Sequence, residues 1–180
     1  GRKTVVGHWQ DPKTLERIAV WQRVAAAWAD SQDMRIIRFG DQMNNVAVTD
    51  GDKVEAEIRF GFHVDYVPFS EVMTYFEKVE DKAVDELVAV YFNEYDHAPE
   101  LEDKSTEAYR KVWNSAKAEL TLRAVLEAYG AKAFTSNFDD LGDVNVEQTG
   151  KGFDQIPGLA SQRLMADGYG FGGEGDWKTA

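Results

Sequence analysis

The apolar residues of this 180-residue chain change their period along the sequence, and this feature limits the possible folds most. Strand-like runs occur at residues 3–8 (KTVVGH), 34–39 (MRIIRF), 54–62 (VEAEIRFGF) and 131–138 (AKAFTSNF). Between these runs, apolar residues recur every three or four positions, as they do on one face of a helix. Strand and helix patterns that alternate in this way predict an α/β domain with a mainly parallel sheet.

Several helix boundaries are marked by residues that favour helix ends. Asp11 and Pro12 predict the start of a first helix. Ser105 or Thr106 can cap a long helix that Gly130 ends. Two further helices are expected between the third strand-like run and this long helix, and a short one after residue 157.

The composition supports a globular core, since 43% of the residues are hydrophobic and 12% are aromatic. Burial is the default expectation for large aromatic side chains. The aromatic residues at core-like positions are Trp9, Trp21, Trp28, Phe60, Phe62, Tyr66, Phe76, Tyr91 and Trp113. Trp177, close to Glu174, is instead expected to shape a pocket.

The charge balance excludes two classes of partner. Twenty Lys and Arg against 32 Asp and Glu give a formal net charge of −12. Nucleic acids and anionic membrane surfaces are bound through clustered Lys and Arg, so neither is an expected partner. The chain has no cysteine, which removes disulfides and thiolate ligands and fits a reducing compartment, so a cytoplasmic location is expected.

A glycine-rich segment near the end, 168–176 (GYGFGGEGD), is the strongest candidate for a site. Residues 168–173 match GxGxxG by letter, but that fingerprint needs a strand before it and a helix after it. A helix is expected before it, which favours close backbone approach over dinucleotide binding. Glu174 and Asp176 lie two residues apart and could bind Mg²⁺ or Mn²⁺; a solvated acidic turn is the alternative.

The three histidines are weaker candidates. His8 ends the first strand-like run, where α/β proteins often build sites, but a histidine that fixes the turn before Pro12 is favoured. His63 and His97 have no HxxE or HxH partner. The sequence also contains no GxSxG and no P-loop, so nucleophilic hydrolysis has no support.

Five longer motifs make the chain resemble the L-arabinose isomerase family from end to end. They are 5–12 (VVGHWQDP), 38–43 (RFGDQM), 46–54 (VAVTDGDKV), 157–165 (PGLASQRLM) and 168–180 (GYGFGGEGDWKTA). The resemblance implies that residues 1–180 are the central domain, with large N- and C-terminal portions of the enzyme absent. It implies a Rossmann-like, three-layer α/β/α fold. Separately from the resemblance, the polar residues 142–153 have no apolar period and are expected to form a mobile surface loop.

The activity implied by this resemblance is interconversion of L-arabinose and L-ribulose, and of D-galactose and D-tagatose. Such a reaction moves a proton between C1 and C2 through an enediol. The family usually uses Mn²⁺, although other divalent cations are possible, and a bound divalent ion polarises the carbonyl. The enzyme is expected to be a homo-oligomer, commonly a hexamer in this family.

Three residues carry the roles that the resemblance implies. Glu174 matches a metal-binding glutamate that is also a candidate acid/base, while Met43 and Phe138 match positions that line the sugar pocket. The other metal ligands would come from the absent C-terminal portion, so this chain alone is expected to be inactive. Two alternatives remain: a folding or oligomerisation module without catalysis, and a nucleotide-binding oxidoreductase domain.

Overall fold

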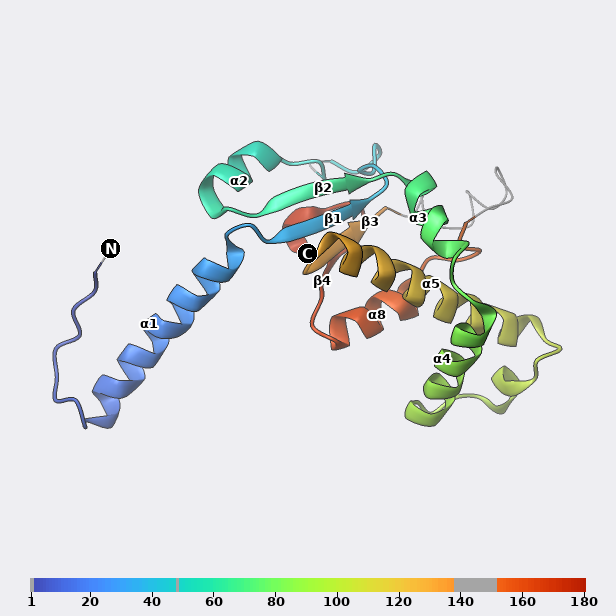
Figure 1. Cartoon of the computed structure of the whole chain (residues 1–180), viewed down its shortest axis with the longest axis horizontal. Coiled ribbons are helices and arrows are strands. Elements are labelled where there is room, and N and C mark those ends of the chain that lie inside the picture. Colours follow the sequence, from blue (N-terminus) through green and yellow to red (C-terminus); the bar gives the residue numbers. More distant parts are fainter. Residues whose placement is uncertain (1, 48, 138–151) are drawn as a thin grey trace.

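A computed structural model describes residues 2–47, 49–137 and 152–180 of the chain. Within these residues, four parallel strands form one sheet in the order β2-β1-β3-β4 (Figure 1). The strands are β1 (Arg35–Phe39), β2 (His63–Val67), β3 (Ala133–Ser136) and β4 (Gly170–Gly172). Because the strands are parallel, all their carboxyl ends lie at one edge of the sheet, where α/β proteins bind ligands.

Helices connect and cover these strands. The described helices are α1 (Pro12–Ser31), α2 (Lys53–Phe60), α3 (Phe69–Phe76), α4 (Asp81–Glu94), η1 (Pro99–Glu102), α5 (Glu107–Tyr129), α8 (Gly158–Ala166) and η2 (Trp177–Thr179). None of them combines the length and the apolar composition that a membrane crossing requires.

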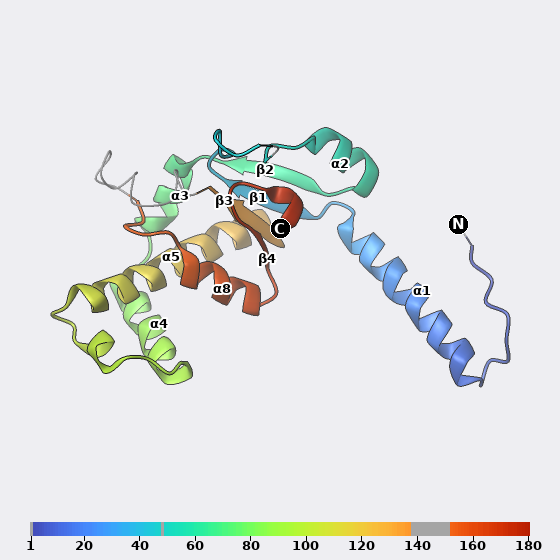
Figure 2. The same cartoon turned by 180° about the vertical axis from the view of Figure 1, so that it is seen from behind.

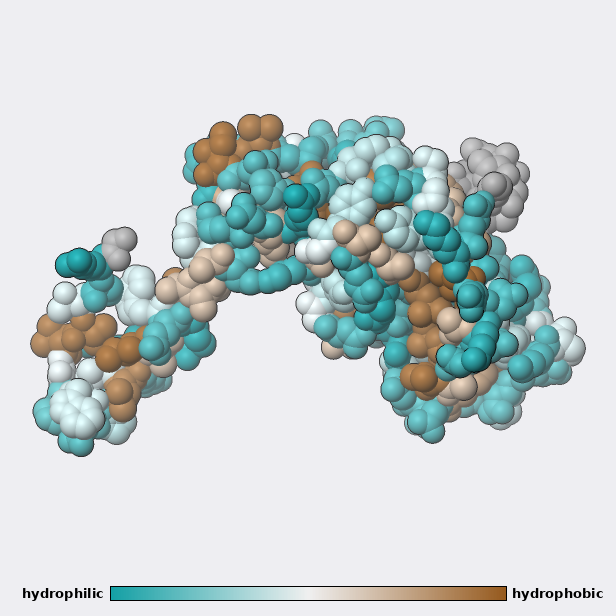
Figure 3. Space-filling view, in the orientation of Figure 1, coloured by the Kyte–Doolittle hydropathy of each residue, from teal (hydrophilic) through white to brown (hydrophobic). Residues whose placement is uncertain are grey.

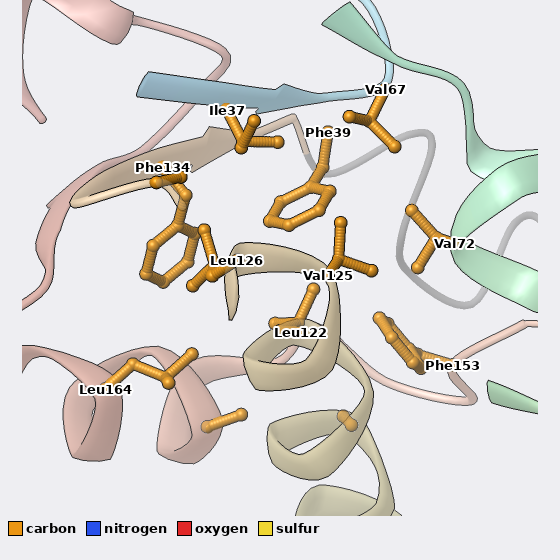
Figure 4. Close-up of a cluster of buried hydrophobic side chains, with 13 residues drawn as sticks. Ile37, Phe39, Val67, Val72, Leu122, Val125, Leu126, Phe134, Phe153 and Leu164 are labelled. Carbon is orange, nitrogen blue, oxygen red and sulfur yellow. The ribbon is translucent and has the colours of Figure 1, made fainter. Parts of the chain in front are cut away.

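One face of the sheet packs on α3, α5 and α8. Figure 4 shows Phe39 and Phe134 of the strands above Leu122 and Val125 of α5, with Leu164 of α8 beside them. All five side chains are fully buried or nearly so. This cluster is the main hydrophobic core, and its burial is the dominant stabilising contribution.

The other face of the sheet carries a smaller cluster under α2 and η2. Ile36 and Ala133 of the sheet pack there with Ala56 of α2 and Trp177 of η2. Alternate residues of a strand point to opposite faces, so β1 supplies Ile36 here and Phe39 to the main core. Helical elements therefore lie on both faces, which confirms the prediction of a Rossmann-like α/β fold.

The long helix α5 begins and ends where the sequence predicts. The Thr106 hydroxyl accepts a hydrogen bond from the backbone N–H of Tyr109 at 3.1 Å. Gly130 adopts the left-handed conformation, with φ of 62°, and ends the helix. The strands expected near 34–39 and 131–138 are confirmed as β1 and β3.

Two predicted strands are wrong. Residues 3–8 contain no strand, and Val6 is 79% exposed, because no sheet edge of the described chain lies beside this run. Residues 54–62 form α2 and the start of a turn, since Asp52 caps a helix and Gly61, with φ of 84°, ends it. For this segment, the capping residues Asp52 and Gly61 therefore indicate the secondary structure better than the alternating pattern of 54–62 does.

The first helix, α1, projects away from the sheet (Figures 1 and 2). The prediction of burial is wrong for Trp21 and Trp28 on this helix, and also for Trp9, Phe60 and Tyr66, which are all exposed. It is confirmed for Tyr91, while Phe62, Phe76 and Trp113 are half-buried. Figure 3 shows exposed apolar residues gathered on α1 and, separately, on α2.

The loop expected at 142–153 lies mostly outside the described residues. Its last residue, Phe153, is described and is buried in the main core. The ring of Phe153 lies 5.7 Å from that of Phe76 and 6.4 Å from that of Phe69. Phe153 is thus packed in the interior, and the prediction of a mobile loop for the rest of the segment stays a prediction.

Candidate functional site

Two segments meet at the carboxyl edge of the sheet and form the candidate site. The segment 40–52 follows β1, and the segment 173–180 follows β4. Gly40 donates a backbone hydrogen bond to Val67 at the end of β2, at 3.0 Å. Gly175 donates one to Ser136 at the end of β3, also at 3.0 Å. Each segment is therefore anchored on the strand next to the one that it follows: the first on β2, beside β1, and the second on β3, beside β4.

The two segments also bind each other directly. The indole N–H of Trp177 donates to the carbonyl of Asp50 at 2.5 Å, and Lys178 Nζ donates to the carbonyl of Thr49 at 3.2 Å. A Cβ atom on Gly51 would lie only 2.8 Å from the Trp177 ring, so glycine is required for this close approach. The prediction that Trp177 shapes a pocket agrees with its position on a 430 Å³ hollow beside α2.

Glu174 lies at the tip of the second segment with an unusual backbone conformation. Its φ is 62°, in the left-handed region that residues other than glycine, asparagine and aspartate rarely occupy. Its side chain is exposed at the carboxyl edge of the sheet. Backbone strain of this kind concentrates at functional sites, where the surrounding structure holds it in place.

Met43 lies on the first segment, close to the turn that carries Glu174. Its side chain is only 8% exposed, and its carbonyl accepts a hydrogen bond from the Thr49 hydroxyl at 3.3 Å. A Cβ atom on Gly175 would lie 3.0 Å from Cα of Gln42 and 3.6 Å from N of Met43. The structure thus brings Met43 and Glu174 onto adjoining turns. Phe138, the third predicted site residue, lies outside the described residues.

The histidines lie apart from this edge. His8 precedes α1, and its Nδ1 accepts from the backbone N–H of Gln10 at 3.2 Å, as expected for a turn-fixing histidine. His63 begins β2, at the opposite edge of the sheet, near Glu57. His97 contacts Glu102 at 2.8 Å, and hydrogen bonds to Tyr95 and then Glu102 raise its pKa.

No group of three or more His, Asp or Glu side chains within the described ranges is arranged to hold a metal ion. Glu174 and Asp176 together supply too few ligands for a hard divalent cation, which takes six or more oxygens. The described residues of this chain therefore do not complete a metal site by themselves.

The glycine-rich segment does not have the geometry of a dinucleotide site. Its middle forms β4, and the element that follows is η2, a 3₁₀ turn of three residues instead of a helix. Its glycines allow close packing: a Cβ atom on Gly172 would lie 2.4 Å from the carbonyl oxygen of Asp176. One on Gly170 would lie 2.9 Å from the backbone of Ala180.

Sequence reasoning missed Arg38, the most buried charged group at this edge. The Arg38 side chain is 9% exposed, and its NH1 atom donates to Asp50 Oδ1 at 2.9 Å. Its Cζ atom lies 5.7 Å from the centre of the Tyr66 ring. An arginine between the apolar residues Ile37 and Phe39, followed by Asp41 and Asp50, was the available signal.

Comparison with known proteins assigns the chain to a family. A family model of the L-arabinose isomerase central domain matches residues 35–180, and one of the L-arabinose isomerase N-terminal domain matches residues 1–33. The chain belongs to the L-arabinose isomerase family. The two matches meet at Met34, between α1 and β1, whereas the sequence analysis assigned residues 1–180 to the central domain.

Individual L-arabinose isomerases are similar over almost the whole chain. The enzyme of Phocaeicola vulgatus is 71% identical and that of Bacteroides thetaiotaomicron 70% identical, each over 179 residues, or 99% of the chain. The Geobacillus stearothermophilus enzyme is 46% identical over 181 residues. The chain spans about a third of the length of these curated relatives, 34% in each case. These comparisons confirm the resemblance found in the sequence motifs.

Proposed function

We propose that this chain forms one part of the active site of an aldose–ketose isomerase that interconverts L-arabinose and L-ribulose. The observation that carries the proposal is the position of Glu174, exposed and in a left-handed conformation at the carboxyl edge of the sheet. The high identity to L-arabinose isomerases over 99% of the chain supports the choice of substrate. D-galactose and D-tagatose are proposed as a second substrate pair.

In the proposed reaction Glu174 acts as the acid/base. It removes the proton from C2 of the aldose, and protonation of the C1 oxygen gives an enediol. A proton is then delivered to C1 while the C2 hydroxyl loses its proton. The hydroxyl at C2 becomes a carbonyl and the aldehyde at C1 becomes a hydroxyl, so the reaction needs no external oxidant or reductant. Met43 and Phe138 are proposed to contact the sugar.

Mn²⁺ is the proposed cofactor, with Glu174 as one of its ligands. The described residues do not complete a metal site, and in this proposal the remaining ligands come from other parts of the enzyme. We therefore expect the chain to form no ketose when it is tested alone.

The proposal can be tested in a chimeric enzyme in which this chain replaces the matching third of the Phocaeicola vulgatus enzyme. Ketose formation from L-arabinose is measured with added Mn²⁺. The chimera should be active and Glu174→Gln should abolish turnover, because an amide cannot exchange a proton as a carboxylate does. Circular dichroism should show an unchanged fold.

The matched control is Glu100→Gln, which removes an exposed carboxylate on η1, away from the sheet edge. This control should keep normal turnover. An inactive chimera, or near-normal turnover of Glu174→Gln, would contradict the proposal. Ketose formation by the chain alone would contradict the proposed sharing of the site.

A role in assembly is a second candidate function, favoured by the exposed apolar side chains of α2. Val54 and Ile58 are 69% and 75% exposed and lie one helical turn apart. Apolar side chains grouped on a surface mark protein interfaces. Sedimentation of the chimera should show a homo-oligomer that Ile58→Glu weakens, and a monomeric wild-type chimera would exclude this role.

A further inference from the structure

Among the described residues, the hydrogen bonds and ion pairs of the buried Arg38 guanidinium are made with one segment of the chain. Its NH1 atom donates to Gln42 Oε1 at 3.2 Å and to Asp50 Oδ1 at 2.9 Å, and NH2 lies 3.3 Å from Asp41 Oδ1. All three acceptors belong to the segment 41–50, which follows β1. A buried charge is costly unless it is paired, so these contacts fix the segment against the end of the strand.

The segment held by Arg38 is the one on which the Glu174 turn rests. Asn137 donates its side-chain N–H to the carbonyl of Asp41 at 2.6 Å, which joins this segment to the end of β3. Gly175 packs so closely on Gln42 that a Cβ atom would lie 3.0 Å from the Gln42 Cα. A shift of the segment 41–50 would therefore displace the backbone beside Glu174.

The charges around Asp50 also favour this position of the segment 41–50. Asp50 also contacts Lys53, and hydrogen bonding to Lys53, followed by that to Arg38, lowers its pKa against the opposing effect of burial. Asp50 thus stays ionised at neutral pH as the partner of Arg38. Within the described residues, Arg38 Nε is buried without a hydrogen-bond partner, so this guanidinium depends on the segment 41–50 for its hydrogen bonds.

We propose that Arg38 is a positioning residue for the isomerisation: it holds the segment 41–50 so that Met43 and the Glu174 turn keep their places. The inference rests on the proposed function, because it concerns the residues assigned to that site. Arg38 contacts no substrate in this scheme. Lysine cannot replace it fully, since an ammonium is a point charge and lacks the planar, forked donor geometry of a guanidinium.

The test uses Arg38→Met and Arg38→Lys in the chimeric enzyme, with steady-state kinetics on L-arabinose at a temperature where every variant is folded. Displacing a catalytic group by about 1 Å can cost on the order of 100-fold in rate. We expect kcat to fall about 10- to 100-fold in Arg38→Met, with a smaller loss in Arg38→Lys and KM within about threefold of wild type.

Arg35→Met is the matched control, because Arg35 lies on the same strand, is half exposed and pairs with Asp65 at 2.5 Å away from the site. It should leave kcat unchanged. If Arg38→Met does not fold, Asp50→Asn, which removes one half-exposed partner of Arg38, should reproduce part of the kcat loss. A folded Arg38→Met enzyme with normal kcat, or with lowered thermal stability alone, overturns the inference.

A second measurement separates this inference from the proposed function. Hydrogen exchange at the Gly175 amide, which is bonded to Ser136, should become at least about tenfold faster in Arg38→Met and stay unchanged in Arg35→Met. This readout does not require activity. An inactive wild-type chimera refutes the proposed function, whereas unchanged exchange at Gly175 refutes the positioning role of Arg38.

Discussion

The two longest described helices, α1 with 20 residues and α5 with 23, use their apolar side chains in opposite ways. On α5, Leu122, Val125 and Leu126 are buried against the sheet, at 1% exposure or less. On α1 the only buried residue is Thr14, while Trp21 and other large apolar side chains are about half exposed. Both helices have capped starts, so local signals determine where a helix begins but not whether it is buried.

The family models give this contrast a structural meaning. They place α1 in the N-terminal domain and α5 in the central domain. Few interactions among the described residues join α1 to the rest of the chain. For example, Gln32 Nε2, just after the helix, donates to the carbonyl of Phe60 at the end of α2, at 2.9 Å, and Lys132 contacts Asp30. We therefore expect the stability of the sheet and of α1 to respond differently to substitution.

The largest effect is expected for Phe134→Ala in the middle of the sheet. Phe134 is fully buried between Phe39 and Phe171, with ring centres 5.9 and 5.0 Å away. Removing a buried phenyl group leaves a cavity and costs about 3–5 kcal/mol. Urea unfolding of the chain measures this loss, and a loss below about 1 kcal/mol would show that the core is loosely packed.

A smaller effect is expected for Glu119→Gln on α5. The buried carboxylate accepts hydrogen bonds from Tyr91 Oη at 2.6 Å, Arg163 Nε at 2.9 Å and Arg123 at 3.0 Å. An amide has one acceptor oxygen and no charge, so the loss should be about 2 kcal/mol. The control is Glu127→Gln, at an exposed position on the same helix. An equal loss of unfolding free energy in both variants would show that the hydrogen bonds of Glu119 do not stabilise the fold.

The smallest effect is expected for Trp28→Ala on α1. Trp28 is 55% exposed, and alanine favours the helix, so the free energy of unfolding should change by less than about 0.5 kcal/mol. The same urea titration measures it. A loss comparable with that of Phe134→Ala would mean that α1 is buried in solution, and the contrast between the helices would not hold.

Much of the fold could be predicted because its signals are local. The caps of α5 and the apolar run of β1 lie within a few residues of the elements they define. The prediction failed at α2, where an alternating pattern competed with the capping residues Asp52 and Gly61. It failed again at residues 3–8, because a β-branched run forms a strand only beside another strand.

The residues of the candidate site also differ in whether the sequence alone could identify them. Glu174 could be found from the sequence, since the glycines around it indicate a tight turn and its motif is long. Arg38 could not be assigned a role, because its partner Asp50 lies 12 residues along the chain in an irregular segment. That pairing depends on where the segment 41–50 folds, which no periodicity encodes.

The left-handed backbone at Glu174 has a consequence for engineering. A glycine would occupy this conformation without the roughly 1–2 kcal/mol that a side chain incurs there. A screen that rewards only heat tolerance would therefore enrich Glu174→Gly, a variant that on our proposal cannot isomerise sugar. If the proposed function is correct, selection for growth on arabinose should be combined with the screen for heat tolerance, so that stability is not gained at the expense of turnover.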